Sequence, residues 1–167
     1  MQISKGVEYA LHCLVYLVDM PKGQSRGIKA LAEFQGVPES YLSKIFTKLK
    51  KAGLLRSNPG VKGGYELAKR PEDISFLNVF EAVEGTQSFF QCMNIRENCI
   101  LYRDQQELPK HIACGTCLIH SVMLTAEQHY KHYLTRTNLQ WLHDHLQKTI
   151  PADYRHRTQI WFRSIEK

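Results

Sequence analysis

Apolar residues recur at alternating spacings of four and three along the first part of the chain, as on one face of an α-helix. The pattern predicts a helix over residues 2–19, with its apolar positions at Ile3, Val7, Ala10, Leu14 and Leu17. Pro21 and Gly23 are expected to end this helix, because neither residue continues a helix well.

A short second helix is predicted over residues 28–35, followed by a tight turn at Gly36. The next helix is predicted over residues 38–51, with Pro38 in its first position, where the missing N–H of proline costs nothing. Its apolar face consists of Leu42, Ile45, Phe46 and Leu49. Two helices joined by a glycine-containing turn are typical of the helix-turn-helix unit.

Two short strands are predicted next, over residues 54–57 and 65–68. The Gly- and Pro-rich stretch 58–64 between them favours a β-hairpin. A hairpin directly after the second helix of such a unit is called a wing. A further helix is predicted over about residues 75–84, with Ser75 as its N-cap.

The second half of the chain is less regular. Residues 85–116 show no periodicity, and a loop of that length is usually functional or disordered. Helices are predicted over residues 117–135 and about 138–148. The tail 151–167 mixes basic and aromatic residues, and we expect a short helix there through Trp161.

The formal net charge is +6 at pH 7, and the basic excess is confined to the first part of the chain. Residues 1–70 carry 12 Lys and Arg against 5 Asp and Glu, whereas residues 71–167 carry 10 against 11. A localised basic excess suits phosphate binding, although a solvated basic face has the same composition. There is no run of about 18 apolar residues and no signal-peptide layout, so we expect a cytoplasmic protein.

The helix over residues 38–51 is expected to lie in the major groove of DNA, with its N-terminal residues facing base edges. A single lysine there is more often only part of the solvated side. The order helix, turn, basic helix and basic glycine-rich hairpin nevertheless favours DNA binding. The candidate contacts are Ser40, Tyr41, Ser43 and Lys44 at base edges, Lys48 and Lys51 on the backbone, and Arg56, Lys62, Gly63 and Gly64 in the wing.

Five cysteines are present, and four of them lie within residues 92–117. Clustered cysteines in a cytosolic chain more often indicate metal or redox chemistry than disulfides. Cys13 is expected to be a buried small hydrophobe of the first helix. Cys114 and Cys117 have the spacing of a redox pair, although the βαβ pattern that accompanies such pairs is missing. The same spacing is found in half of a structural zinc site.

Six stretches of the chain are distinctive: ISKGVEYAL at residues 3–11, VPESYLSKI at 37–45, LKKAGLL at 49–55, GVKGGYEL at 60–67, VFEAVEG at 79–85 and CLIH at 117–120. Together they resemble the IscR/NsrR/CymR-like family of bacterial regulators. The resemblance covers about residues 1–147. It implies a homodimer whose long C-terminal helices cross, and binding to palindromic operators, usually as a repressor.

The predicted fold is therefore mainly α-helical with a small β-hairpin wing: a winged helix-turn-helix domain joined to a long dimerisation helix. The chain divides into four parts. They are a DNA-binding domain at residues 1–84, a cysteine-rich cluster-binding loop at 85–116, dimerisation helices at 117–148 and a C-terminal tail at 149–167.

Many members of the resembled family hold an iron–sulfur cluster on three evenly spaced cysteines, and this chain departs from that spacing. Glu8 and His12 are four residues apart, so they share one face of the first helix, either as an ordinary surface pair or as joint metal ligands. The resemblance points to a subgroup with a [2Fe–2S] centre, in which the first helix supplies ligands to the partner's cysteine loop. The implied ligands are Glu8 and His12 with Cys92 and Cys117, then Cys114, and last Cys99.

The sequence thus predicts a dimeric, sequence-specific transcription regulator, a repressor that senses redox or nitrosative state through its cluster, and not an enzyme. A change in the cluster would move the two recognition helices relative to each other. One alternative is a cluster-free regulator of the same fold that responds to thiol oxidation, zinc, a metabolite or a partner protein. A thiol–disulfide enzyme and a zinc-stabilised interaction module are alternatives from other classes.

Overall fold

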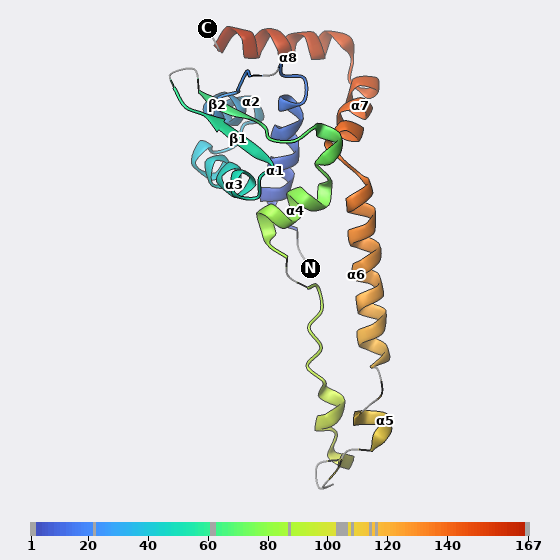
Figure 1. Ribbon diagram of the computed structural model, residues 1–167. Coiled ribbons are helices and arrows are strands. Elements are labelled where there is room, and N and C mark those ends of the chain that lie inside the picture. Colours follow the sequence, from blue (N-terminus) through green and yellow to red (C-terminus); the bar gives the residue numbers. More distant parts are fainter. Residues whose placement is uncertain are drawn as a thin grey trace. The chain divides into compact units, whose positions relative to one another are not determined.

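The computed structural model describes residues 3–21, 23–60, 63–86, 88–102, 107, 109–113, 115 and 117–165. They form two compact units, one from the described residues between 88 and 132 and the other from residues up to 86 together with residues from 133 onward. Figure 1 labels the elements of both. In the part described, none of the helices combines the length and the apolar character needed to cross a membrane.

The first helix, α1 (Lys5–Leu14), continues into a 3₁₀ turn, η1 (Val15–Leu17). It is shorter than the helix predicted over residues 2–19. At its start the Ser4 side chain accepts a hydrogen bond from the Gly6 N–H, which makes Ser4 the N-cap. At its end the chain tightens into the 3₁₀ turn before the predicted stop at Pro21 is reached.

The predicted helix-turn-helix is present. Helix α2 (Ile28–Gln35) is followed by Gly36 in the left-handed conformation, with φ of 64°, and then by α3 (Glu39–Lys51). Pro38 lies one position earlier than expected, as an N-cap with extended backbone. An N-cap N–H takes no part in the hydrogen bonds of the helix, so the N–H that proline lacks is not needed there.

The predicted wing is also present. Strands β1 (Leu55–Asn58) and β2 (Gly64–Leu67) pair antiparallel, with Leu55 opposite Leu67 and Asn58 opposite Gly64. The sequence did not indicate that Arg26 pairs with Tyr65 on the other edge of β2, through two backbone hydrogen bonds of 2.9 and 3.0 Å.

Helix α4 (Phe76–Glu84) follows a 3₁₀ turn, η2 (Pro71–Asp73). It begins as predicted at the N-cap Ser75, which exchanges hydrogen bonds with Asn78 in a capping box. Helix α1 packs against α2, α3 and α4. The core that they enclose includes Cys13, Leu14, Leu31, Leu42, Phe46, Leu49 and Val79.

Three helices make up most of the second half of the chain: α6 (Leu118–Arg136), α7 (Leu139–Thr149) and α8 (Ala152–Ile165). Helix α8 is longer than the short helix expected in the tail. Its residue Phe162 is 1% exposed, and the ring lies 4.8 Å from the ring of Phe34 on α2.

The cysteine-rich loop is largely irregular, as predicted, with short helical turns η3 (Ile95–Asn98), η4 (Ile100–Tyr102) and α5 (Lys110–Ala113). Its first residues are held to α6 by Glu127. The carboxylate of Glu127 accepts hydrogen bonds from the Ser88 hydroxyl at 2.7 Å and the Phe89 N–H at 3.1 Å.

Candidate functional site

The outer face of α3 carries the side chains predicted to contact DNA. Ser40, Tyr41, Lys44, Lys48 and Lys51 are exposed, and Ser43 is half-buried. The opposite face of the helix is fully buried in the core. This arrangement leaves the N-terminal half of α3 accessible to a groove, as a recognition helix requires.

Tyr41 is exposed and also packs on α1. Its ring meets the edge of the Tyr9 ring, with centroids 5.9 Å apart. A Cβ atom added at Gly6 would lie 3.3 Å from the Tyr41 hydroxyl oxygen, so the two elements approach closely there. The contact fixes the position of a candidate base-reading side chain against α1.

Lys48 has a structural partner that the sequence did not reveal. Its Nζ donates a 2.7 Å hydrogen bond to the carbonyl oxygen of Val83, in the last turn of α4. A cation at a helix C-terminus stabilises the carbonyl groups left unpaired there. Lys50 makes a similar link to the wing, since its Nζ donates to the Ser57 hydroxyl at 2.6 Å.

The wing presents Arg56, whose side chain is 64% exposed and lies 3.6 Å from the carboxylate of Glu66 on the paired strand. Gly63 and Gly64 have a role in the fold. A Cβ at Gly63 would clash with the Asn58 carbonyl oxygen, and one at Gly64 with the Arg26 carbonyl oxygen. Lys62 lies outside the described residues.

Two of the predicted cluster ligands, Cys92 and Cys117, are brought together. The Cys92 side chain hydrogen-bonds to the sulfur of Cys117. Cys117 is the residue immediately before α6. The pKa of Cys117 is lowered, first by the backbone N–H of His120, then by that of Ile119, with Arg96 and Cys92 adding to the effect. Cys114 lies outside the described residues.

The loop around this thiol pair is held by Arg96. Its guanidinium donates to the Gly115 carbonyl oxygen and, at 3.2 Å, to the Asn94 side chain. Cys99 is half-buried. The Nδ1 atom of His120 is buried and has no hydrogen-bond partner among the described residues.

Cys13 behaves as predicted. It is completely buried in α1, and burial raises the pKa of its thiol to about 12. A thiol in that state is a poor nucleophile and a poor metal ligand. The candidate chemistry therefore lies in the loop cysteines.

Glu8 and His12 are exposed neighbours on α1. They line a surface hollow of about 180 Å³ together with Tyr9, Gln35 and Val37. Gln35 and Val37 flank Gly36, the turn between the two helices of the helix-turn-helix unit. Within the described ranges, no three His, Cys, Asp or Glu side chains gather closely enough to hold a metal ion.

A helix-turn-helix with an exposed basic second helix and an attached hairpin defines a winged helix-turn-helix transcription regulator. The chain belongs to the Rrf2 family, because residues 3–145 match the family model, which is described as an iron-dependent transcriptional regulator. This membership confirms the predicted family and identifies a transcription regulator and not an enzyme.

Relatives that are similar in sequence are transcription regulators as well, and a solved structure has a similar fold. YffB of Lactococcus lactis subsp. lactis (strain IL1403) is 41% identical over 100 residues, 60% of this chain and 64% of YffB. The regulator NsrR of Shouchella clausii (strain KSM-K16) is 33% identical over 102 residues, 60% of this chain and 68% of NsrR. The solved structure of CymR, the global cysteine regulator of B. subtilis, covers 87% of this chain and 98% of its own, at a TM-score of 0.65. At 22% identity this last likeness shows the fold alone.

Proposed function

We propose that the protein is a homodimeric repressor that holds a [2Fe–2S] cluster and binds a palindromic operator according to the state of that cluster. The proposed ligands are Cys92 and Cys117 of one chain with Glu8 and His12 of its partner. The observation that carries the proposal is the contact between the two thiols, which lie 25 positions apart in the sequence. Description of the family as iron-dependent also supports it.

The donor set fits such a group. Two thiols, a carboxylate and an imidazole provide four ligands for two irons, and histidine replaces cysteine in other [2Fe–2S] sites. The Cys117 sulfur receives N–H groups from the first turn of α6, which favours the thiolate that a metal requires. When bound, the cluster supplies a one-electron change of charge at this position.

The chain itself offers a connection from these ligands to the DNA-reading unit. Glu8 and His12 share their hollow with Gln35 and Val37, on either side of the turn at Gly36. A shift of the two α1 side chains would therefore change the shape of the hollow beside the junction between α2 and α3. Operator half-sites have a fixed spacing, so a small rotation of α3 weakens binding.

A second subunit is supported by α6. Its apolar side chains at Leu118, Ile119 and Val122 are 80%, 67% and 66% exposed, and Tyr133 further along the same face is 68% exposed. Single folded chains rarely leave a contiguous apolar surface of this kind uncovered. A crossing of two α6 helices would cover it, and the two-fold symmetry of such a dimer matches that of a palindromic operator.

The first experiment is purification of the protein without oxygen, followed by its visible spectrum and an assay of iron and sulfide. We expect a coloured protein with about two irons and two sulfides per cluster. Cys92→Ser and Cys117→Ser should lose the iron, and Glu8→Ala and His12→Ala should lose or alter the spectrum. Cys99→Ser is the matched control from the same loop and should keep the colour. Full iron content in both the Glu8 and the His12 variants would contradict the proposed ligand set.

The same thiol contact favours a second candidate function, a cluster-free regulator that responds to peroxide. The Cys117 thiolate would attack the peroxide O–O bond and form a sulfenic acid, and the Cys92 thiol would then displace water to form a disulfide. This candidate predicts a colourless, iron-free protein that still binds DNA and loses two titratable thiols on peroxide treatment. Iron with matching sulfide in the purified protein would count against it.

A further inference from the structure

Helix α8 lies entirely beyond residues 3–145, the part of the chain that matches the family, yet it is firmly packed. Phe162 is 1% exposed, and its ring lies 5.5 Å from that of Tyr16 and 4.8 Å from that of Phe34. Trp161 adds a further ring contact with Phe34, at 4.9 Å. The helix-turn-helix unit thus carries an additional helix on the side of α2.

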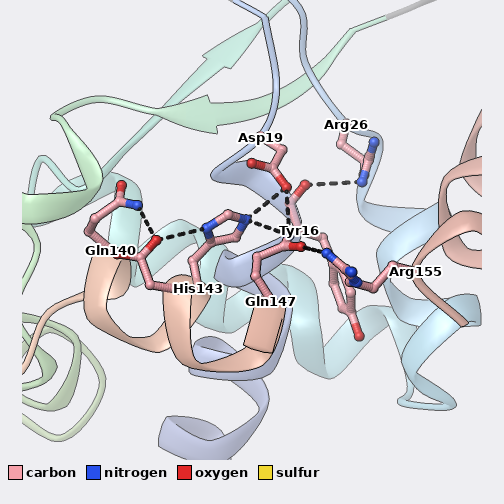
Figure 2. A network of polar contacts seen from close by, with 8 residues as sticks. Tyr16, Asp19, Arg26, Gln140, His143, Gln147 and Arg155 are labelled. Atoms are coloured by element: carbon pink, nitrogen blue, oxygen red, sulfur yellow. Dashed lines mark hydrogen bonds and ion pairs between the residues drawn. The ribbon is translucent and has the colours of Figure 1, made fainter. Parts of the chain in front are cut away.

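One residue connects α8 with the wing. The guanidinium carbon of Arg26 lies 3.7 Å from the centre of the Phe162 ring, within the range of a cation–π interaction. The same guanidinium donates a 3.0 Å hydrogen bond from Nη1 to the Tyr16 carbonyl oxygen, as Figure 2 shows. The side chain of Arg26 is therefore held on two sides, by α8 and by the end of the first helix.

The backbone of Arg26 forms the outer pairing of the wing. Its N–H donates to the Tyr65 carbonyl oxygen at 3.0 Å, and its carbonyl oxygen accepts from the Tyr65 N–H at 2.9 Å. Gly64 lets the two backbones approach this closely, since a Cβ there would clash with the Arg26 carbonyl oxygen. Tyr65 in turn packs its ring edge on Phe46 of α3, with centroids 5.1 Å apart.

Helix α8 is itself anchored by a polar network. Arg155 of α8 donates to the Gln147 side chain of α7, and Gln147 contacts His143 at 3.0 Å. His143 is bonded at 2.8 Å to the carboxylate of Asp19, which follows η1 (Figure 2). The start of α8 is thus tied to the same part of the chain that Arg26 contacts.

We propose that α8 braces the wing through Arg26, so that Arg26 and Phe162 are positioning residues for DNA binding. A two-stranded hairpin is marginally stable alone. The added pairing with Arg26 supports β2 on its outer edge, and that pairing depends on a side chain clamped by the Phe162 ring. Loss of the ring is expected to loosen the wing before it affects the core around α1, α3 and α4.

The test is backbone amide exchange on the full-length protein, followed by NMR, which needs no DNA. In Phe162→Leu we expect the amides of Arg26 and Tyr65 to exchange at least about fivefold faster than in the unaltered protein, with α3 core amides unchanged. Trp161→Leu is the matched control, since it removes ring contacts with Phe34 and with Phe162 but leaves the Phe162 ring beneath Arg26, so we expect a smaller effect. Arg26→Gln, which keeps α8 intact, should reproduce the effect of Phe162→Leu. Unchanged exchange at Tyr65 in Arg26→Gln, or an equal effect of Trp161→Leu, would overturn the proposal.

A second readout uses a duplex selected from a random library by the unaltered protein. Phe162→Leu should weaken binding about fivefold when Arg56 is present in the wing, and should add little to the loss already caused by Arg56→Ala. A merely destabilising change would instead weaken binding by the same factor in both backgrounds. That additive result would also overturn the proposal.

Discussion

At the scale of single residues, Lys44 and Lys48 stand one helical turn apart on α3 but have different surroundings. Both are exposed, and the sequence predicted a DNA contact for each, Lys44 at base edges and Lys48 on the backbone. The ammonium group of Lys48 is bonded to the Val83 carbonyl oxygen at the end of α4. One lysine is thus expected to serve DNA binding and the other chiefly the fold.

Replacement of each lysine by methionine separates these roles. Lys44→Met should reduce the slope of log binding constant against log salt by about one, because one cation in contact with the DNA is lost. Lys48→Met should leave that slope nearly unchanged and lower the free energy of unfolding by about 1 kcal/mol, since the Val83 carbonyl loses its partner. Salt titrations of DNA binding and urea unfolding of both variants provide the measurement. Equal slope changes in the two variants would contradict the assignment.

Glu127 gives a prediction about acid. Its pKa is lowered from 4.5 to about 2, first by the hydrogen bond from Lys131, then by those from Ser88 and the Phe89 N–H. A carboxyl group with a depressed native pKa stabilises the fold fully above its unfolded value and loses that contribution as pH falls. The stabilisation from Glu127 should therefore disappear between about pH 4.5 and about pH 2.

Glu127→Gln tests this, because glutamine does not titrate. The difference in unfolding free energy between the unaltered protein and the variant should be constant above about pH 5 and shrink toward about pH 2. Unfolding curves measured in denaturant across this range provide the check. A difference that stays the same at every pH would show that the Glu127 charge does not hold the loop.

At the scale of elements, helices α4 and α7 are joined where they begin. The Phe76 N–H donates to the Thr137 carbonyl oxygen at 2.8 Å, and the Leu139 N–H donates to the Ile74 carbonyl oxygen at 3.0 Å. Each helix has its own side-chain N-cap beside this bridge, Ser75 for α4 and Asn138 for α7. The chain after α6 is thereby fixed to the winged domain.

Asn138→Ala removes the cap of α7, which accepts a 2.8 Å hydrogen bond from the Trp141 N–H. We expect a loss of about 1 kcal/mol in unfolding free energy. Asn138→Asp is the matched control, because aspartate caps helices equally well and its charge is favourable at a helix N-terminus. Thermal or urea unfolding measures both. A loss of the same size in Asn138→Asp would mean that the side chain acts through something other than capping.

At the scale of the whole molecule, the proposed dimerisation depends on the apolar face of α6. Val122 is 66% exposed in the single chain, and the proposed dimer would bury it. A charge introduced there would have to be desolvated on association, at a cost of several kcal/mol. Gln128 is exposed on the other side of the same helix, so a charge there is tolerated in either state.

Val122→Glu should therefore produce a monomer of 19.4 kDa, whereas Gln128→Glu should keep the mass of two chains. Light scattering after gel filtration measures the mass directly. The monomeric variant should also lose at least about tenfold in affinity for a palindromic duplex, because two linked half-site contacts become one. A Val122→Glu protein that keeps the mass of two chains would exclude this face as the interface.

The sequence by itself determined the elements whose cause is local. Helix α2 and the tight turn at Gly36 lie where it predicted, and the two strands of the wing lie within one residue of the predicted ranges. Ser75, as an N-cap residue, likewise predicted the start of α4. Periodicity, caps and turn residues act over a few positions, so they can be interpreted without knowledge of the fold.

Tertiary structure alone decided the contacts between distant segments. It placed Lys48 on the end of α4 and Phe162 beneath Arg26. The mixed basic and aromatic tail predicted only a short helix, whereas the burial of Phe162 depends on rings supplied by α2 and η1. Such contacts follow from how the elements pack in space, and the residues near each position in the sequence carry no signal of them.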